Sequence, residues 1–484
     1  MLVKTVLLLF FVSFGACDPS VVIVGAGASG IAAAARLLKN DITNITILEA
    51  EDRIGGRVYS VPLGDGYVDL GAEWCHGEKD NIVYDMVKDL NILQHTNKFY
   101  PEIYHSKFKR LDQNFSNLLL DTFDELIGEP NKNSSIGERL IARYEEVISQ
   151  WKNDPRVYAL AQEAITVFEA YVIGYEGAFS WFDISDNDDY ILSDGDLYLH
   201  WNGHGFKTIL DLLMQKYPDA SKSLPIDDKV LLNKEVHEIA WSSKQAVVKC
   251  SDSSTYVADH VIVTVSLGVL KHQHTSLFRP KLPSDKLQAI EQLGIAAVHK
   301  VLLHFPQRWW NDSYTGNCFL WNKDDAKHIS FGEGPVKDGI SWLTSVSVLL
   351  PVLHNPNVLE VWILGHFVPK VEQCPDEVVI NGVMYLLDYF GVAVAETITR
   401  PDIIIRNNWY TNPHFRGTYS FQTPRTRHGY HSDPAILSEP LGNNREKPNL
   451  LFAGEASNPT HYSTVQGAIE TGFREADRIL KMYK

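Results

Sequence analysis

The chain has 484 residues, and its 60 acidic and 44 basic side chains give a formal net charge of −16. The length exceeds one ordinary domain of ~100–200 residues, and 45% hydrophobic with 21% charged residues excludes a disordered or fibrous protein. The negative charge disfavours nucleic acid and anionic membrane surfaces as partners, because like charges repel. It suits a cationic ligand, although solubility alone also explains it.

The first 17 residues are predicted to be a cleaved secretory signal peptide. Lys4 precedes the apolar run 6–12, and small residues follow at 15–17, where we expect cleavage. The run is too short to span a bilayer; an uncleaved anchor or a buried strand is the alternative. Four N-glycosylation sequons agree with a secreted, extracellular protein: Asn44, Asn114, Asn133 and Asn311.

Four cysteines remain after such cleavage: Cys75, Cys250, Cys318 and Cys374. They are widely spaced and form no CxxC pattern, so one disulfide is possible, with a pairing that the sequence does not specify. No metal site is predicted, since His272 and His274 have no further ligand nearby. No later apolar run of about 18 residues follows, so we expect a soluble mature protein.

A dinucleotide-binding turn is predicted directly after this leader. The apolar run 21–24 suits a strand buried on both faces, and an alanine-rich helix follows from 31 to 38. Between them lies a GxGxxG pattern with the predicted cofactor-binding residues Gly25, Gly27, Ser29 and Gly30. Glycines there bring the backbone close to a pyrophosphate, which the helix N-terminus faces. A second strand, 45–48, ends at Glu49, whose carboxylate is predicted to accept hydrogen bonds from ribose hydroxyls.

A pair of glycines flanked by arginines comes next. Gly55 and Gly56 can enclose a pyrophosphate from its other side, and Arg57 supplies a guanidinium fork. The succession of GxGxxG, acidic residue and GGR resembles the flavin-dependent amine oxidase family. The resemblance implies FAD rather than NAD as the cofactor. It also implies noncovalent binding, because no cysteine lies near Tyr462, where monoamine oxidases carry the one joined to their flavin.

The resemblance extends over nearly the whole chain and implies an α/β fold. A Rossmann-like FAD-binding domain of the GR2 type is expected beside an α+β substrate domain with a mixed or antiparallel sheet. The flavin elements lie at both ends and in the middle, so the predicted domains are discontinuous. The FAD-binding domain takes 18–92, 203–288 and 435–484, and the substrate-binding domain takes 93–202 and 289–434. Within the latter, helices are expected at 136–152 and 154–168, and strands at 340–348 and 358–367.

The segment 69–77 is the first discriminator within the family. Secreted L-amino-acid oxidases typically place an arginine here to bind a carboxylate, and this chain has none. The order Trp74, His76, Gly77 is instead similar to animal spermine oxidases and N1-acetylpolyamine oxidases. This implies that His76 lies near the flavin and contacts the substrate amine, and that Trp74 is in the substrate site. A histidine that only orients the loop is the alternative.

Two later segments match further cofactor-binding parts of the family. The segment 231–239 looks like the strand whose valine backbone holds the adenine, here Val236. Near the end, the strand 450–453 and a glycine turn lead into a helix that ends near Lys481. This strand, turn and helix are implied to bring backbone N–H groups to the flavin and ribityl end. Their implied cofactor-binding residues are Gly454, Glu455, Thr464 and Val465.

Lys300 is the predicted catalytic residue of a strand within 296–305. Alternation puts Val298, Lys300 and Leu302 on one face, so the ammonium lies among apolar neighbours. Such a position is costly unless the function requires it. In the family, the matching lysine holds a water beneath flavin N5. A surface lysine on an edge strand is the alternative.

The aromatic residues of the substrate site depart from the family pattern. Plant members frame the substrate between rings, and one such position falls here on Val298, so the cage is incomplete or rebuilt. The segment 408–419 matches the family's active-site segment. Its candidates for substrate binding are Tyr410 and Tyr419, together with Thr464 in the flavin-facing turn; ordinary core packing is the alternative.

The resemblance predicts an FAD-dependent polyamine oxidase. A secondary amine of spermine, spermidine or their N1-acetyl forms would become an imine, which water hydrolyses to an aldehyde and a shorter amine, while O2 becomes H2O2. The expected partners are a polyamine and O2, with no nucleic acid and no membrane. An oxidase of amino acids or monoamines, or a silent FAD-binding protein, is the alternative, and the oligomeric state stays open. Candidates for an acidic substrate entrance, or for a solvated loop, are Asp183, Asp186, Asp188 and Asp189.

Overall fold

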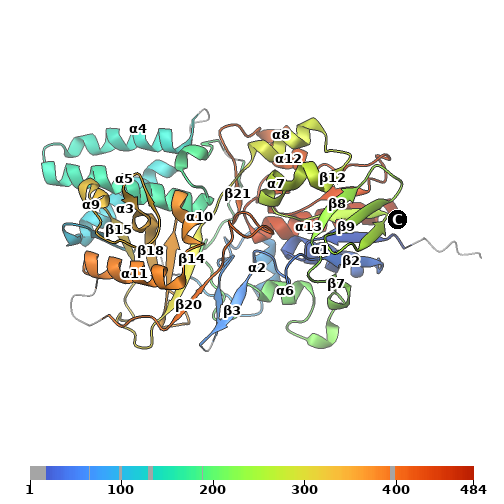
Figure 1. Ribbon diagram of the computed structural model, residues 1–484, viewed down its shortest axis with the longest axis horizontal. Helices are drawn as coiled ribbons and strands as arrows, with labels where there is room; N and C mark the ends of the chain where they lie inside the picture. Colours follow the sequence, from blue (N-terminus) through green and yellow to red (C-terminus); the bar gives the residue numbers. More distant parts are fainter. Residues whose placement is uncertain are drawn as a thin grey trace, which may run out of the picture.

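The computed structural model describes residues 18–64, 66–96, 101–128, 134–187, 189–392 and 398–483. The predicted signal peptide, the sequon at Asn133 and the acidic residue Asp188 lie outside these residues. Figure 1 shows an elongated molecule in which two halves lie side by side, each built around its own sheet.

The first half is built on a parallel sheet of five strands. Its order is β22-β11-β1-β2-β7, and every pairing is parallel. All four residues of β1 are buried, as expected for a central strand that is covered on both faces. The strands are β1 (Val21–Val24), β2 (Ile45–Leu48), β7 (Val230–Leu231), β11 (His260–Val263) and β22 (Leu450–Phe452). The strands predicted at 21–24 and 45–48 are therefore confirmed.

The first and last helices of the described chain pack against each other beside this sheet. They are α1 (Ala28–Leu38) and α13 (Val465–Tyr483), and a Cβ added to Gly472 would lie 2.2 Å from Ser29 O. The helix predicted at 31–38 is confirmed and starts earlier, at Ala28. The remaining helices of this half are α2 (Ile82–Val87), α6 (Thr208–Leu213), α7 (Leu267–Leu277), α8 (Ser284–Gln292) and α12 (Asp433–Ser438).

A four-stranded sheet, β10-β9-β8-β12, adjoins the parallel one. The single strand predicted at 231–239 is wrong, because the chain turns between β7 and β8. Asn233 has a φ of 57°, and its N–H donates to Glu51 O at 3.0 Å instead of extending the strand. The strands are β8 (Val236–Ala240), β9 (Ala246–Cys250), β10 (Thr255–Ala258) and β12 (Phe278–Arg279).

The second half is built on a seven-stranded sheet, β20-β14-β19-β18-β15-β5-β6. Its pairings are antiparallel except for β15 with β5, so the predicted mixed sheet is confirmed. The strands are β5 (Glu102–His105), β6 (Lys109–Arg110), β14 (His299–His304), β15 (Asn317–Leu320), β18 (Val346–Pro351), β19 (Val358–Ile363) and β20 (Ile403–Arg406). Short two-stranded sheets are formed by β3 (Ser60–Leu63) with β4 (Gly66–Asp69), β13 (Gly294–Ile295) with β21 (Ser420–Phe421), and β16 (Val336–Lys337) with β17 (Ile340–Ser341).

Two strand predictions of this half are wrong in their bounds. Residues 342–345 form a 3-10 turn, because the Ser341 side chain accepts the N–H of Leu343 and the Trp342 indole is buried. β19 ends at Ile363, since Gly365 has a φ of 77° and begins another 3-10 turn. In the sequence, the pattern of apolar and polar residues does not distinguish either 3-10 turn from a strand.

Long helices cover the second half. Ser135 and Glu138 form a capping box that starts α4, and Asp154 caps α5, which ends where Gly177 adopts a φ of 69°. The helices predicted at 136–152 and 154–168 are thus confirmed, the second being longer than expected. The helices are α3 (Gln113–Ile127), α4 (Ile136–Ile148), α5 (Pro155–Glu176), α9 (Lys323–Lys327), α10 (Val368–Val371) and α11 (Asp376–Phe390).

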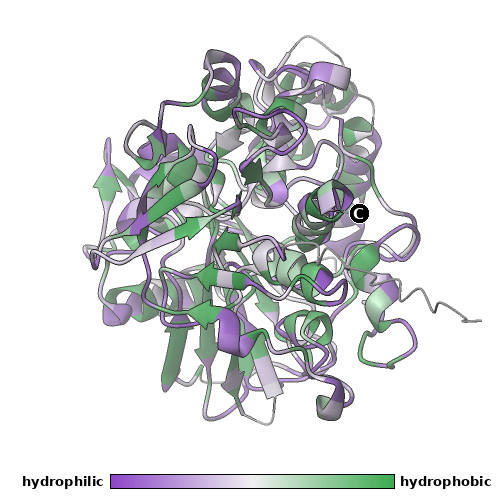
Figure 2. Cartoon of the chain, turned by 90° about the vertical axis from the view of Figure 1, so that its right-hand side faces the viewer, coloured by the Kyte–Doolittle hydropathy of each residue, from purple (hydrophilic) through white to green (hydrophobic). Residues whose placement is uncertain are grey.

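Each half has its own hydrophobic core. Figure 2, viewed from the side of the first half, shows many green, hydrophobic strands among purple, hydrophilic loops and helix segments. The strands of the two large sheets divide as the predicted domains do, and the domain boundaries themselves stay predictions. Among the described residues, no helix combines the length and apolar character that a membrane crossing needs. The four cysteines in this part of the chain are free thiols, without a disulfide.

Candidate active site

A cavity of about 1180 Å³ extends from the parallel sheet into the second half. One end is lined by the predicted cofactor-binding turns, including Gly25, Gly27 and Ser29. The other end is lined by residues of the seven-stranded sheet and of α5, including Lys300, and by Tyr419, which directly precedes β21. The two sets of residues predicted from the sequence therefore meet in one space.

The first glycine turn is shaped by close backbone approach. Gly25 has a φ of 107°, and a Cβ on Gly30 would lie 2.0 Å from Gly25 O, so α1 begins immediately after β1. A Cβ on Gly27 would meet no atom closer than 3.9 Å, and the residue lines the cavity. Backbone N–H groups at the start of α1 can therefore approach a phosphate there.

The second glycine pair lies against the first. Gly55 and Gly27 form a parallel bridge, and Gly55 and Gly56 have φ values of 102° and 59°. Arg57, which lines the cavity, donates from Nη1 to Glu455 Oε1 at 2.9 Å and to Thr418 O at 2.8 Å. The arginine is thus fixed by its partners before any ligand binds.

Glu49 ends β2 as predicted and is 6% exposed. Its Oε2 accepts the N–H of Ala26 at 2.6 Å, and its Oε1 accepts the N–H of Glu51 at 2.9 Å. Burial raises the pKa of this carboxyl, and the two backbone N–H groups oppose that shift. Glu49 lines the cavity next to Gly25, in the position from which a ribose can be bound.

The turn before α13 completes this end of the cavity. Gly454 has a φ of 112°, and Glu455 accepts the N–H of Ser463 at 2.8 Å and the hydroxyl of Ser420 at 2.5 Å. Thr464 accepts the N–H of Gly467 at 2.9 Å and so caps α13. The predicted residues Val236, Thr464 and Val465 line the same cavity.

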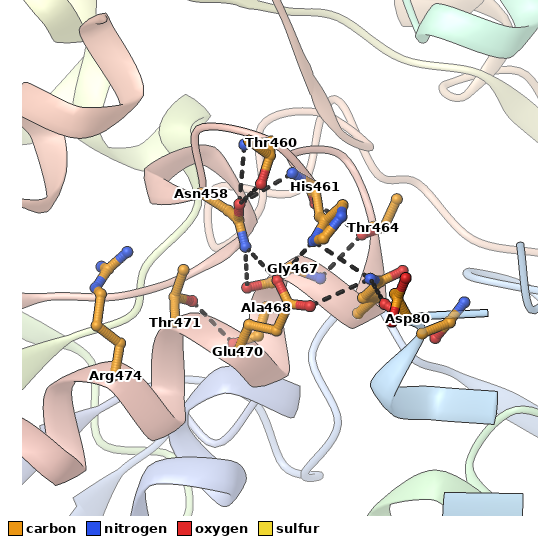
Figure 3. Close-up of polar contacts among 12 residues, drawn as sticks. Asp80, Asn458, Thr460, His461, Thr464, Gly467, Ala468, Glu470, Thr471 and Arg474 are labelled. Carbon is orange, nitrogen blue, oxygen red and sulfur yellow. Dashed lines mark hydrogen bonds and ion pairs between the residues drawn. The ribbon is translucent and has the colours of Figure 1, made fainter. Parts of the chain in front are cut away.

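A polar network behind this turn fixes its shape, as Figure 3 shows. Asn458, 5% exposed, accepts the N–H groups of Thr460 and His461 at 3.0 and 2.9 Å, and donates to Glu470 Oε2 at 2.8 Å. Glu470 also binds His461 Nδ1 at 2.8 Å. Gln466 connects the network to the loop of His76 through Asp80 O, at 3.1 Å.

These residues fit FAD. Two glycine turns leave room for a pyrophosphate, Glu49 lies where a ribose binds, and the α13 turn presents backbone N–H groups further along the same cavity. The predicted cofactor-binding residues thus line the same cavity, except for Gly30, which packs against Gly25 O behind the turn. None of the cysteines in the described part of the chain belongs to the turn before α13, residues 462–465.

Lys300 lies at the opposite end of the cavity, in the second half, and belongs to an ionic cluster that was not predicted from the sequence. Its Nζ is 2.7 Å from Glu73 Oε2 and 3.4 Å from Glu360 Oε1, and its side chain is 5% exposed. Burial opposes the charge, but the two carboxylates raise the pKa of Lys300 above its ordinary value. Glu360 was detectable as the lone charged residue of the apolar strand β19. The alternative of a surface lysine on an edge strand is wrong, since β14 lies between β20 and β19.

Trp74 and His76 both line the cavity beside this cluster. Trp74 stacks on Trp362 with ring centroids 5.7 Å apart, and its other neighbour, Tyr198, meets it edge-on at 5.6 Å. His76 Nδ1 donates to Leu197 O at 2.6 Å, and burial lowers the pKa of His76. The imidazole is therefore neutral, with Nε2 available as an acceptor.

The two tyrosine candidates have different positions. Tyr419 lines the cavity, with its hydroxyl bound to Gly174 O at 2.5 Å and its ring against Gly177 at the end of α5. Tyr410 does not line it; its ring packs on Phe179, with centroids 5.2 Å apart. Its backbone N–H donates to Glu372, which fixes the ring in the core of the second half. Tyr410 is therefore a packing residue, as the alternative reading allowed.

The described aspartates of the loop 183–189 do not form the entrance. Asp186 is buried in an ion pair with Arg139, whose Nε lies 2.7 Å from Oδ1. Asp189 accepts the N–H of Gly429 at 3.1 Å, and Asp183 is exposed outside the cavity lining. Other carboxylates line the substrate end instead: Asp69, Glu73, Asp124, Glu176, Asp196 and Glu360.

The comparisons with known proteins agree with this geometry. The family model described as flavin containing amine oxidoreductase matches residues 28–480. The chain is 26% identical to the human peroxisomal N(1)-acetyl-spermine/spermidine oxidase over 96% of its length and 95% of that protein. It is 26% identical to maize polyamine oxidase 1, covering 96% of this chain and 90% of that protein. It is 27% identical to the anon-37Cs protein of Drosophila lebanonensis, covering 96% and 88%.

A solved structure of a putrescine oxidase double mutant, redesigned in its cofactor binding, has the same fold. It superposes with a TM-score of 0.61 at 17% sequence identity and covers 96% of this chain and 99% of that one. The family match spans both halves of the molecule and both ends of the cavity. The chain therefore belongs to the flavin-containing amine oxidoreductase family, with FAD as its cofactor.

Proposed function

We propose that the protein is an FAD-dependent polyamine oxidase that acts on a secondary amine of spermine, spermidine or their N1-acetyl forms. The observation that carries this proposal is the charge of the substrate end. Among the described residues that line this end, six carboxyl groups are accompanied by one ammonium, that of Lys300. A chain of several ammonium groups is the ligand that such a lining attracts.

The side chains of this end serve two opposite requirements. The carboxylates attract the distal ammonium groups of a polyamine, whereas the nitrogen that reacts must lose its proton. The stacked rings of Trp74 and Trp362 exclude water from a nitrogen beside them, and this desolvation disfavours its charged form. His76 Nε2 would accept the N–H of that neutral nitrogen, and Lys300 would hold a water molecule near the flavin.

The oxidation itself depends on the cofactor. When bound, FAD takes a hydride equivalent from the carbon next to the nitrogen and passes the electrons to O2, which becomes H2O2. The amine becomes an imine, and water hydrolyses it to an aldehyde and a shorter amine. The protein supplies orientation, through Trp74 and Tyr419, and excludes bulk water from the apolar part of the cavity.

A substrate panel tests the proposal. We expect the purified holoenzyme to release H2O2 from spermine, spermidine or N1-acetylspermine, and not from L-amino acids or benzylamine. Activity confined to amino acids or to the monoamine would contradict the proposal. Flavin that none of the amines reduces in the absence of O2 would identify a binding protein instead.

We further propose that the protein is secreted and N-glycosylated. Three sequon side chains of the described chain, Asn44, Asn114 and Asn311, are exposed. Expression in a eukaryotic secretory system should give medium-borne protein that starts near residue 18 and loses mass on treatment with an N-glycosidase. Retention of residues 1–17 in protein that stays inside the cells would contradict this part of the proposal.

A further inference from the structure

The ionic cluster around Lys300 has more negative than positive groups. Lys300 lies between Glu73 and Glu360, and the carboxyl of Asp69 is close enough to act on its charge. Asp69 has its own partners, the Ser60 hydroxyl and the N–H of Phe206 at 3.0 Å. One ammonium therefore faces three carboxyl groups in a buried region.

In the part of the chain that the structure describes, Glu360 has one oxygen without a good hydrogen bond. Its side chain is 4% exposed, and among the described residues no hydrogen bond of good geometry reaches Oε1, although Lys300 Nζ lies 3.4 Å away. Both Glu360 and Glu73 line the cavity, and the Glu73 side chain is 22% exposed. The cavity wall thus contains a buried carboxyl oxygen that lacks a hydrogen-bond donor from the described residues.

We propose that Glu73 and Glu360, bridged by Lys300, form an ammonium-binding site that gives up a proton when a positively charged amine binds. Without a ligand, Glu360 carries the proton and the cluster stays close to neutral. An incoming ammonium group replaces that proton as the compensating positive charge. The exchange is balanced: Glu360–COOH and R–NH3⁺ give Glu360–COO⁻ paired with R–NH3⁺, and H⁺ passes to solvent.

The electrostatics of the neighbouring elements agree with this exchange. Burial, followed by the charge of Glu73, raises the pKa of Glu360 to about 8, and burial raises that of Asp69 to about 7. His200 and His354, whose rings lie 4.9 Å apart on the cavity wall, have lowered pKa values and are neutral at pH 7. Among the described side chains, Lys300 is therefore the cation that Glu73 and Glu360 share.

This inference rests on the proposed function, since it concerns the same site. Its first consequence is a pH dependence of binding. Below the pKa of Glu360, binding of a cation has to displace a proton, so the affinity should rise up to tenfold per pH unit and level off above about pH 8. Glu360→Gln mimics the protonated carboxyl in shape, so this variant should fold and bind amines without that dependence.

The experiment measures proton release on binding. Photoreduced holoenzyme, which cannot oxidise a substrate, is mixed with spermine without O2 at pH 7 in a weakly buffered indicator solution. We expect the parent protein to release more protons per bound spermine than Glu360→Gln does, by up to about one proton, since the proton that the reacting nitrogen loses is released by both proteins. Glu169→Gln is the matched control, because burial also raises the pKa of Glu169, which does not line the cavity; it should release as many protons as the parent protein.

Three outcomes would overturn the inference. Spermine that binds the parent protein without proton release, or a release of equal size in Glu360→Gln, shows that the proton is not on this cluster. Proton release that is lost to the same extent in Glu169→Gln would show that removing a carboxyl group outside the cavity has the same effect. The H2O2 panel reports separately on the proposed function, so an active polyamine oxidase whose proton release is unchanged in Glu360→Gln contradicts only the present inference.

Discussion

Arg57 Nη1 lies 2.9 Å from Glu455 Oε1, and this ion pair joins residues 398 positions apart in the chain. The arginine comes from the second glycine turn, and the glutamate from the turn before α13. Both side chains line the cavity, and Glu455 is 6% exposed. The pair therefore connects the two ends of the FAD-binding wall.

Replacing this arginine should weaken FAD binding. Arg57→Lys retains a positive charge but cannot reach both Glu455 and Thr418 O with a planar fork. Loss of one charged hydrogen bond, about 1.5–3 kcal/mol, corresponds to about a tenfold to hundredfold higher Kd for FAD. Titration of the apoprotein with FAD, followed by flavin fluorescence, measures this Kd. Arg36→Lys, at an exposed pair with Asp477, is the control and should leave the Kd unchanged.

Lys300→Met should slow the reaction while FAD stays bound. The substitution removes the ammonium that Glu73 and Glu360 share, and the apolar side chain cannot hold a water molecule. We expect flavin reduction by spermine or reoxidation by O2 to slow at least about tenfold, as is usual when a group that stabilises developing charge is removed. Stopped-flow absorbance of the flavin separates the two steps. Rates equal to those of the parent protein would remove Lys300 from the catalytic site.

The same variant should be less stable unless its partners are also changed. An unpaired buried carboxylate costs about 3–5 kcal/mol. Combining Lys300→Met with Glu73→Gln should therefore restore part of the free energy of unfolding without restoring the rate. Recovery of both would indicate a purely structural role for Lys300.

His299 should make the protein sensitive to acid. It is fully buried, and burial, followed by the charge of Arg406, lowers its pKa to about 3. The unfolded chain takes up a proton below the ordinary histidine pKa of about 6.5, while the folded protein does not. The free energy of unfolding should therefore fall by up to about 1.4 kcal/mol per pH unit between about pH 6.5 and 3.

His299→Leu should remove this contribution. Urea unfolding at several pH values gives the slope, which should be shallower in the variant than in the parent protein. His237→Leu, at an exposed position of β8, is the control and should leave the slope unchanged. Equal slopes in His299→Leu and the parent protein would show that another group titrates.

Asn458→Ala should loosen the turn before α13. The amide accepts two backbone N–H groups and donates to Glu470 (Figure 3), and it is buried. Leaving those donors unpaired should cost about 2 kcal/mol of unfolding free energy. FAD binding should weaken as well, because Thr464 and Val465 lie on the same turn. Thermal unfolding with and without added FAD measures both effects, with Asn40→Ala, an exposed site at the end of α1, as the control.

The cofactor end could be predicted from the sequence because its signals are local. A buried strand, three glycines and a helix follow one another without interruption from Val21 to Leu38, and their order alone specifies the turn. Glu49 likewise follows directly from its strand. Each of these features acquires its geometry from neighbouring residues alone. The resemblance to the family supports the same prediction.

The substrate end could be predicted only in part, because its contacts join distant residues. Lys300 was found from its position in an apolar strand, but its partners Glu73 and Glu360 come from a loop and from another strand. The acidic loop was misread for the same reason, since the partner of Asp186 is Arg139 on α4. Tyr410 shares its segment with Tyr419, yet Glu372 directs it into the core. Sequence neighbours alone do not reveal such pairs.

The parallel sheet also constrains when the cofactor can bind during synthesis. β22, an edge strand that pairs with β11, and α13, which packs on α1, come from the last residues of the described chain. A nascent chain on the ribosome must therefore have emerged as far as α13 before the FAD-binding wall is complete, and such long-range pairings form slowly. Cofactor loading should be a late step of biogenesis, and a chain that stops short of α13 should leave the ribosome without FAD.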